Sequence, residues 1–157
     1  MQEKQLVLQI YERHKDALYR LCYFYMGNPQ DASDALQNTL IHLIEYEGRF
    51  ESEAHEKAWL MKVGANECRQ MHRQWWKRRV SCSEELVFEC REQQERYEKN
   101  ETLQAVLALP EKYRIPIYMH YYEGYSTQEI AQILGAGEAT VRSWMRRGRI
   151  QLRKKLE

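Results

Sequence analysis

The sequence predicts an all-α protein of two small helical domains that a flexible acidic linker joins. Apolar residues recur at intervals of three and four along most of the chain, and neither an alternating strand pattern nor an Asn-Gly hairpin turn occurs. With 157 residues, the chain is long enough for one ordinary domain or two very small ones. Residues 81–100 lack a strong apolar stripe, so we expect domains at 1–80 and 101–157 with this linker between them.

The first domain is predicted to be a bundle of three or four helices. Its first helix is expected over about residues 2–26, with Leu6 and Ile10 facing inward, before the sequence GNPQD breaks it. Asp31 is the expected N-cap of the second helix. A third helix is expected over about residues 54–77. The buried stripe predicted for the second helix is Ala32, Ala35, Leu36, Thr39, Leu40 and Leu43.

The second domain contains the pattern of a helix-turn-helix. A helix starting near Leu103 is followed by another that Pro110 opens and that Pro116 is expected to bend. Ser126 and a glutamate three residues later form a capping box for a short helix, which Gly135 closes in a left-handed conformation. A final helix starts near Gly137. Two short helices joined by a turn with glycine are typical of a helix-turn-helix.

The final helix is predicted to have one apolar and one cationic edge. Gly148 lies on the apolar edge although glycine costs a helix about 1 kcal/mol relative to alanine, so we expect another helix to approach closely there. Because the second helix of such a motif enters the major groove, the cationic edge indicates DNA binding. The apolar edge is Val141, Met145, Gly148, Leu152 and Leu156; the cationic edge is Arg142, Arg146, Arg149 and Arg153.

The charge distribution supports a polyanionic partner. The net charge is only +1, but seven of the fourteen residues in 142–155 and five of the eleven in 69–79 are Lys or Arg, and neither segment contains an acidic residue. Both segments also contain tryptophan, which suits a partner with flat bases. The four cysteines lack zinc-site spacing, so no metal and no cofactor is predicted. The absence of a spanning segment or signal peptide predicts a cytoplasmic protein.

Two sets of motifs resemble one family. DASDALQNTLIHLIEYEGRF is similar to the D-A-x-D-x-x-Q-x-T-F segment, and AWLMKVGANECRQMHR to the A-W-L-x-x-I-A-x-N-x-x-x-D-x-x-R segment, of region 2 in bacterial extracytoplasmic-function (ECF) sigma factors. The stretch from LPEKYR to GAGEATVRSWMRRGR resembles region 4 of the same family. The chain is therefore similar to an ECF sigma factor over nearly its full length. Gln70, Gly137, Trp144 and Gly148 depart from the family pattern, which usually has Asp, Ser, Arg and Ala there.

The resemblance implies a role for each domain. In the family, the second helix of region 2 docks on the clamp coiled coil of the largest polymerase subunit, here through Asp34, Gln37, Asn38 and Ile41. The third helix recognises the minus-ten promoter element, here through Lys62, Asn66, Arg69 and Arg73, and the loop from Gly48 to Lys57 corresponds to a base-capturing loop. Region 4 binds the minus-thirty-five element, here through Thr140, Arg142, Ser143, Arg146, Arg147 and Arg149.

The implied partners are core RNA polymerase, through its clamp coiled coil and its flap, and promoter DNA. Family membership also implies an anti-sigma factor, which could hold the protein at the inner face of the membrane. No small-molecule substrate is expected, and the protein is not predicted to be an enzyme, because no triad, metal-spaced carboxylate cluster or phosphate-binding glycine loop occurs. The alternative function is a stand-alone helix-turn-helix regulator that binds duplex DNA as a dimer.

Overall fold

The computed structural model describes residues 2–74 and 100–157, and seven helices but no strand lie within these ranges. The chain divides into two units, residues 1–87 and 88–157, and each is described by itself. The predicted linker lies outside the described residues except for Asn100. The same holds for the end of the predicted third helix, residues 75–77.

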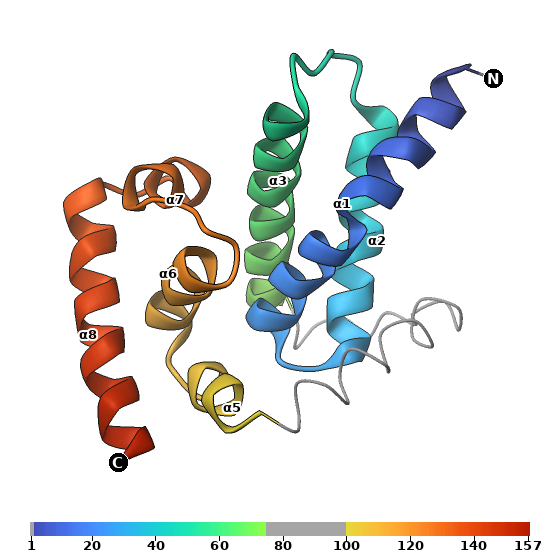
Figure 1. The fold of residues 1–157 in the computed structure, drawn as a ribbon. Coiled ribbons are helices and arrows are strands. Elements are labelled where there is room, and N and C mark those ends of the chain that lie inside the picture. Colours follow the sequence, from blue (N-terminus) through green and yellow to red (C-terminus); the bar gives the residue numbers. More distant parts are fainter. Residues whose placement is uncertain (1, 75–99) are drawn as a thin grey trace. The chain divides into compact units, whose positions relative to one another are not determined.

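Unit 1 is a three-helix bundle in its described part. It consists of α1 (Gln2–Met26), α2 (Pro29–Glu45) and α3 (Glu53–Gln74), and each helix packs against the other two (Figure 1). The expected N-cap of the second helix was wrong. Asn28, not Asp31, is the cap, and its side-chain oxygen accepts a hydrogen bond of 2.9 Å from the backbone N–H of Asp31. Asp31 lies instead in the first turn, where a carboxylate suits the helix dipole.

The core of unit 1 is formed by the second half of α1 with the inner faces of α2 and α3. Leu21 and Cys22 are completely buried, and Leu60 of α3 is 2% exposed. The expectation that Leu6 faces inward was wrong, because its side chain is 54% exposed. The first turns of α1 project away from the other two helices, so the apolar spacing that continues into this end meets no core (Figure 1).

Unit 2 contains the predicted helix-turn-helix. It consists of α5 (Glu101–Leu107), α6 (Glu111–Tyr121), α7 (Thr127–Leu134) and α8 (Glu138–Leu156) (Figure 1). The capping box is confirmed, since Ser126 and Glu129 exchange side-chain-to-backbone hydrogen bonds of 3.1 Å in both directions. Gly135 closes α7 with a left-handed φ of 67°, as expected. Arg114 of the L-P-x-x-x-R motif donates to the carbonyl of Leu107 at 3.1 Å, which ties α6 to the end of α5.

The apolar edge of α8 packs against α6. Val141, Met145 and Gly148 are buried, whereas Leu156 is 50% exposed, so the edge ends before the helix does. The expected close approach at Gly148 is confirmed. A Cβ atom there would overlap the side chain of Ile117 and lie only 3.2 Å from the Cβ of Tyr113. Glycine therefore lets the axes of α6 and α8 come closer than any other residue would allow.

Candidate nucleic-acid interface

The outer face of α8 is a row of exposed cations. Arg142, Arg146, Arg149 and Arg153 are all exposed, and their line lies about a quarter turn around the helix from the buried Val141 and Met145. Of the predicted contact set, Thr140 and Ser143 are exposed as well, outside the line of the four arginines. The spacing of four, three and four residues places the four guanidinium groups on one line along the helix. Such a row matches the spacing of phosphates and base edges along a groove.

Arg147 differs from its neighbours on α8. It is exposed but hydrogen-bonds the hydroxyl of Tyr113 on α6, and this bond lowers the pKa of Tyr113 despite the opposing effect of burial. The ammonium of Lys112 lies 5.1 Å from the centre of the same ring and adds to the lowering. Arg147 therefore serves as a link between α8 and α6, and a helical wheel alone did not distinguish it from the other predicted contacts.

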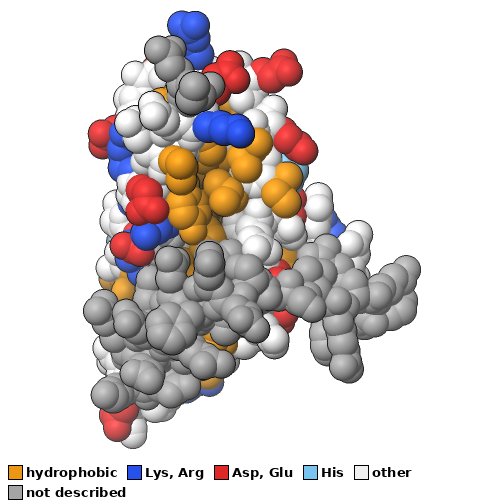
Figure 2. All heavy atoms as spheres, turned by 90° about the vertical axis from the view of Figure 1, so that its right-hand side faces the viewer, with side chains coloured by type: hydrophobic (Ala, Val, Ile, Leu, Met, Phe, Trp, Pro, Cys, Tyr) orange, Lys and Arg blue, Asp and Glu red, His pale blue; other side chains and the backbone are white. Residues whose placement is uncertain are grey.

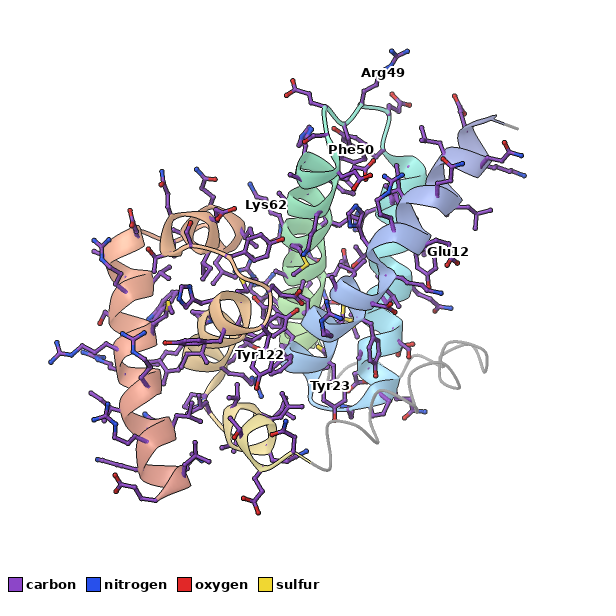
Figure 3. The ribbon with its side chains drawn as sticks, in the orientation of Figure 1. Glu12, Tyr23, Arg49, Phe50, Lys62 and Tyr122 are labelled. Atoms are coloured by element: carbon purple, nitrogen blue, oxygen red, sulfur yellow. The ribbon has the colours of Figure 1, made fainter. Side chains whose placement is uncertain are left out.

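The predicted DNA-binding residues of α3 lie on the outer side of that helix. Lys62, Asn66 and Arg73 are exposed and Arg69 is half-buried. Figure 3 shows the side chain of Lys62 projecting from α3 on the side away from α1 and α2. Arg69 donates to the side-chain oxygen of Asn66 at 2.5 Å, which leaves the amide N–H₂ of Asn66 facing outward as a donor. The four residues thus form one polar, mainly cationic face.

Sequence reasoning missed an aromatic cluster that anchors the loop between α2 and α3. The ring of Tyr46 stacks on Phe50 with centroids 4.9 Å apart, and Trp59 lies 4.6 Å from Tyr46 and 5.5 Å from Phe50. In Figure 3, Phe50 points back toward the helices while Arg49 projects from the tip of the loop. The loop is held at its base by these rings and exposes its tip. The signal in the sequence was three aromatic residues within fourteen positions, 46 to 59.

Of the four α2 residues that the family resemblance implies for docking on the polymerase, three reach the surface of the helix. Gln37 and Asn38 are half-buried, and Ile41 is 50% exposed. The expectation that Asp34 is exposed was wrong, since it is 2% exposed. The prediction treated only one side of the helix as buried. Residues 32–36 are consecutive and all buried, so every side of α2 is packed against other residues there.

Ile44 extends this face and was not predicted. Its side chain is 61% exposed, one turn after Ile41. Figure 2 shows the side of the molecule that bears α1 and α2, where hydrophobic side chains gather between acidic and basic ones. The large exposed hydrophobic residues of these two helices are Leu6, Leu8, Ile41 and Ile44. Contiguous exposed apolar area of this kind is typical of protein-binding surfaces.

A partly buried ion network, in which His14 and Glu56 are buried and Arg13 is exposed, fixes α1 against the start of α3. Arg13 donates to Glu56 at 2.6 Å, and the ring nitrogen Nε2 of His14 lies 3.0 Å from the same carboxylate oxygen. Burial raises the pKa of Glu56, but the hydrogen bonds from Arg13 and His14 outweigh it, so the pKa is lowered. Because Glu56 lies in the first turn of α3, the network holds the helix that bears Lys62 and Asn66.

Within the described ranges, no group of three or more His, Cys, Asp or Glu side chains could hold a metal ion. Cys22 and Cys68 are buried there and form no disulfide within the described residues, while Cys82 and Cys90 lie outside them. Trp75 and Trp76 of the second basic segment also lie outside them. Among the helices that the structure describes, none combines the length and apolar content that crossing a bilayer requires.

Comparison with known proteins assigns both units to one family. Residues 10–78 match the family described as Sigma-70 region 2, and residues 99–152 match Sigma-70, region 4. The chain is 27% identical over 155 residues to the RNA polymerase sigma factor SigV of Bacillus subtilis, covering 96% of this chain and 93% of that protein. It is 30% identical over 148 residues to the ECF RNA polymerase sigma factor SigL of Mycobacterium tuberculosis, covering 90% and 83%.

Two solved structures share the fold. CnrH in complex with the cytosolic domain of CnrY matches with a TM-score of 0.64 and 22% identity, over 98% of this chain and 88% of that one. The sigma factor RpoE in complex with the anti-sigma factor NepR from Bartonella quintana matches with a TM-score of 0.62 and 20% identity, over 98% and 95%.

Proposed function

The chain belongs to the ECF RNA polymerase sigma factors of the sigma-70 family, and from that membership we propose how its surfaces direct initiation at chosen promoters. The observation on which the proposal rests is that each unit presents one outward cationic helix face, on α3 and on α8, backed by its own buried core. One chain thus has two DNA-binding faces. Neither unit supplies catalytic chemistry of its own; the polymerase does.

The α8 face binds the minus-thirty-five element as duplex DNA. Its early residues lie nearest the base edges and its later arginines meet phosphates, as in other helix-turn-helix proteins. Arg142 and Arg146 are exposed, and guanidinium groups pair with guanine in the major groove. The base-edge and phosphate contacts are Thr140, Arg142, Ser143, Arg146 and Arg149. Arg147, which also bonds Tyr113, has the smaller role.

The α3 face and the loop before it bind the minus-ten element. Lys62, Arg69 and Arg73 contact phosphates, and the amide of Asn66 is free to donate to an exposed base edge. The aromatic cluster supports this role because it fixes the base of the loop while Arg49 at the tip stays accessible (Figure 3). A fixed loop loses less conformational entropy when it captures a base.

The exposed face of α2 binds core RNA polymerase. Gln37, Asn38 and Ile41 lie on it, and we add Ile44 and omit Asp34 because of their exposure. Apolar residues surrounded by polar ones are typical of a protein interface. The flap of the polymerase is the expected contact of unit 2. Binding of both units to one polymerase–promoter complex adds modest contacts by effective concentration.

We also propose a cytoplasmic location and an anti-sigma partner. Both solved structures that match were determined as complexes, one with the cytosolic domain of CnrY and one with the anti-sigma factor NepR. An anti-sigma factor for this chain would cover the apolar α1–α2 face and the cationic faces until a signal releases them. If that partner were anchored in the membrane, it would hold the chain at the inner face.

The test is run-off transcription with purified core polymerase from the source organism on a pool of promoter fragments. Adding the chain should give selective initiation on a subset of fragments. Arg142→Ala combined with Arg146→Ala should abolish the selection, while binding to core polymerase, measured by gel filtration, should persist. Ile41→Glu should instead abolish binding to core polymerase, and selective initiation should be lost with it.

The stand-alone regulator makes a different prediction. A dimeric regulator would bind palindromic duplex DNA tightly without polymerase, whereas a sigma factor alone should bind promoter fragments weakly. Tight binding of the free chain to duplex targets, with no affinity for core polymerase, would overturn the proposed function.

A further inference from the structure

One carboxylate joins the two helices of the helix-turn-helix and one arginine of the cationic face. The oxygen Oε1 of Glu138, in the first turn of α8, accepts a hydrogen bond of 3.1 Å from the hydroxyl of Thr127, the first residue of α7. The same oxygen accepts a bond of 2.8 Å from Nη1 of Arg142, one turn further along α8. Glu138 is therefore fixed from one side by α7 and holds Arg142 on the other.

This cluster contributes little to the stability of the fold. The side chains of Arg142 and Glu138 are 59% and 43% exposed, and ion pairs between exposed side chains add little to the stability of a fold. Its effect on the arginine is larger. The bond from Nη1 to Glu138 restrains the side chain of Arg142. Because a guanidinium has five N–H donors, the remaining donors stay available for a base edge. Restraint before binding lowers the entropy lost on binding.

The other arginines of the face are not restrained in this way. Within the described residues, neither Arg146 nor Arg149 forms an ion pair, although both are exposed on the same line of the helix as Arg142. A free arginine can turn to the nearest phosphate, which binds any sequence. The carboxylate of Glu138 also repels DNA phosphates. This repulsion weakens binding to any DNA site at which Arg142 makes no compensating contact with a base.

We propose that Glu138 is a positioning residue that sets base discrimination at the base pair recognised by Arg142, because it restrains the guanidinium and disfavours phosphate contacts. The inference rests on the proposed binding of α8 to the upstream promoter element. Thr127 supports Glu138 from α7, so the spacing between the two helices is part of the same device.

The experiment uses holoenzyme, reconstituted from core polymerase and the full chain, and a promoter library randomised in the upstream element. The wild-type profile and the Arg142→Ala profile first identify the base pair whose preference depends on Arg142. Glu138→Gln should then lower the preference at that base pair by about two- to tenfold, the range expected for releasing one long side chain. Preferences at the other positions should remain.

Three further variants separate positioning from charge and from folding. Thr127→Val keeps the charge and shape but removes the donor to Glu138, so it should lower the same preference by a smaller factor. Glu101→Gln removes one exposed negative charge from α5 and should leave the profile unchanged. Glu138→Gln in the Arg142→Ala background should change the profile no further, because the arginine through which it acts is gone.

The binding of holoenzyme to non-promoter duplex should rise in Glu138→Gln by about two- to fivefold at moderate salt, since one repulsive charge is lost. An unchanged profile in Glu138→Gln would overturn the inference, as would an equal loss of preference at all positions. A wild-type holoenzyme that selects no promoter would instead contradict the proposed function, so the two failures are distinguishable.

Discussion

Unit 1 contains side-chain bonds that join helices far apart in the sequence, whereas the side-chain bonds described in unit 2 mostly join residues close together. Arg13 and His14 of α1 bond Glu56 of α3, and His42 of α2 bonds Glu67 of α3. In unit 2, Ser126 and Glu129 bond each other across three positions, and Arg114 reaches Leu107 across seven. Among the described residues of unit 2, the bonds between Thr127 and Glu138 and between Arg147 and Tyr113 reach further along the chain.

The difference shows how each unit holds its DNA-binding helix. The position of α3 depends on polar contacts between helices that only the finished bundle brings together. The position of α8 depends on the capping box of α7, the glycine turn that follows it and apolar packing on α6. Substitutions of polar residues should therefore reduce the stability of unit 1 more than that of unit 2. Substitutions that change packing volume should be the main way to alter the stability of unit 2.

The largest effect is expected for Glu56→Gln. The amide cannot accept the same charge-assisted bonds from Arg13 and His14, and the loss at a buried site should reduce the stability of unit 1 by about 2 kcal/mol. Amide hydrogen exchange, resolved by residue, would measure this in α1 and α3 without assuming that both units unfold together. Glu53→Gln is the matched control, because Glu53 is exposed and lies 3.5 Å from Arg13. An equal effect of both substitutions would contradict the network.

The same carboxylate predicts a pH dependence. The pKa of Glu56 is lowered below its ordinary value of 4.5 by the bonds from Arg13 and His14, so its stabilisation is complete above pH 4.5 and is lost as the pH falls through the lowered pKa. The stability difference between the wild type and Glu56→Gln should be constant above pH 4.5 and should shrink below it. A difference that grows on acidification would show that the carboxylate is not stabilised in the folded state.

Local bonds are also the part of the structure that the sequence predicts well. The capping box at Ser126 and the turn at Gly135 follow from residues a few positions apart, and both are confirmed. The close approach at Gly148 is a contact between α8 and α6, and it was predictable only because a glycine stood on the apolar edge of the helix. The N-cap of α2 was placed three residues late, because Asn28 and Asp31 are both good cap residues and only the structure shows which one precedes the helix.

Contacts between distant residues could not be predicted in this way. No pattern in the sequence links His14 to Glu56, which lie 42 positions apart. The burial of Asp34 has the same cause, since it depends on what covers the far side of α2. The exposure of Lys62, Asn66 and Arg73 was predictable because a helical wheel separates the two sides of a helix. Which of those exposed groups are already bonded, such as Asn66 to Arg69, was not.

Ser126→Ala tests the local half of the comparison. It removes the acceptor for the backbone N–H of Glu129 and should destabilise α7 by about 1 kcal/mol, a typical value for losing a helix cap. Hydrogen exchange should rise in α7 and the first turn of α8 but not in unit 1. Asn28→Ala removes the corresponding cap of α2 and is the matched control, which should affect unit 1 alone. Spread of either effect into the other unit would contradict independent stabilisation.

Gly148→Ala should have the smallest net effect, because two terms oppose each other. Alanine gains about 1 kcal/mol of helix propensity, but its Cβ would overlap the Cδ1 atom of Ile117, which is 1% exposed, so this side chain would have to shift within the core. Overpacking costs about 1–3 kcal/mol, so the net loss in unit 2 should lie at the low end of about 0–2 kcal/mol. Ile117→Val removes the Cδ1 atom that would be overlapped. Added to Gly148→Ala, it should restore the stability of unit 2, measured by hydrogen exchange in α6 and α8, although Ile117→Val alone is destabilising. If the two changes were simply additive, the approach of α8 to α6 would not be limited by this contact, and the glycine would need another explanation.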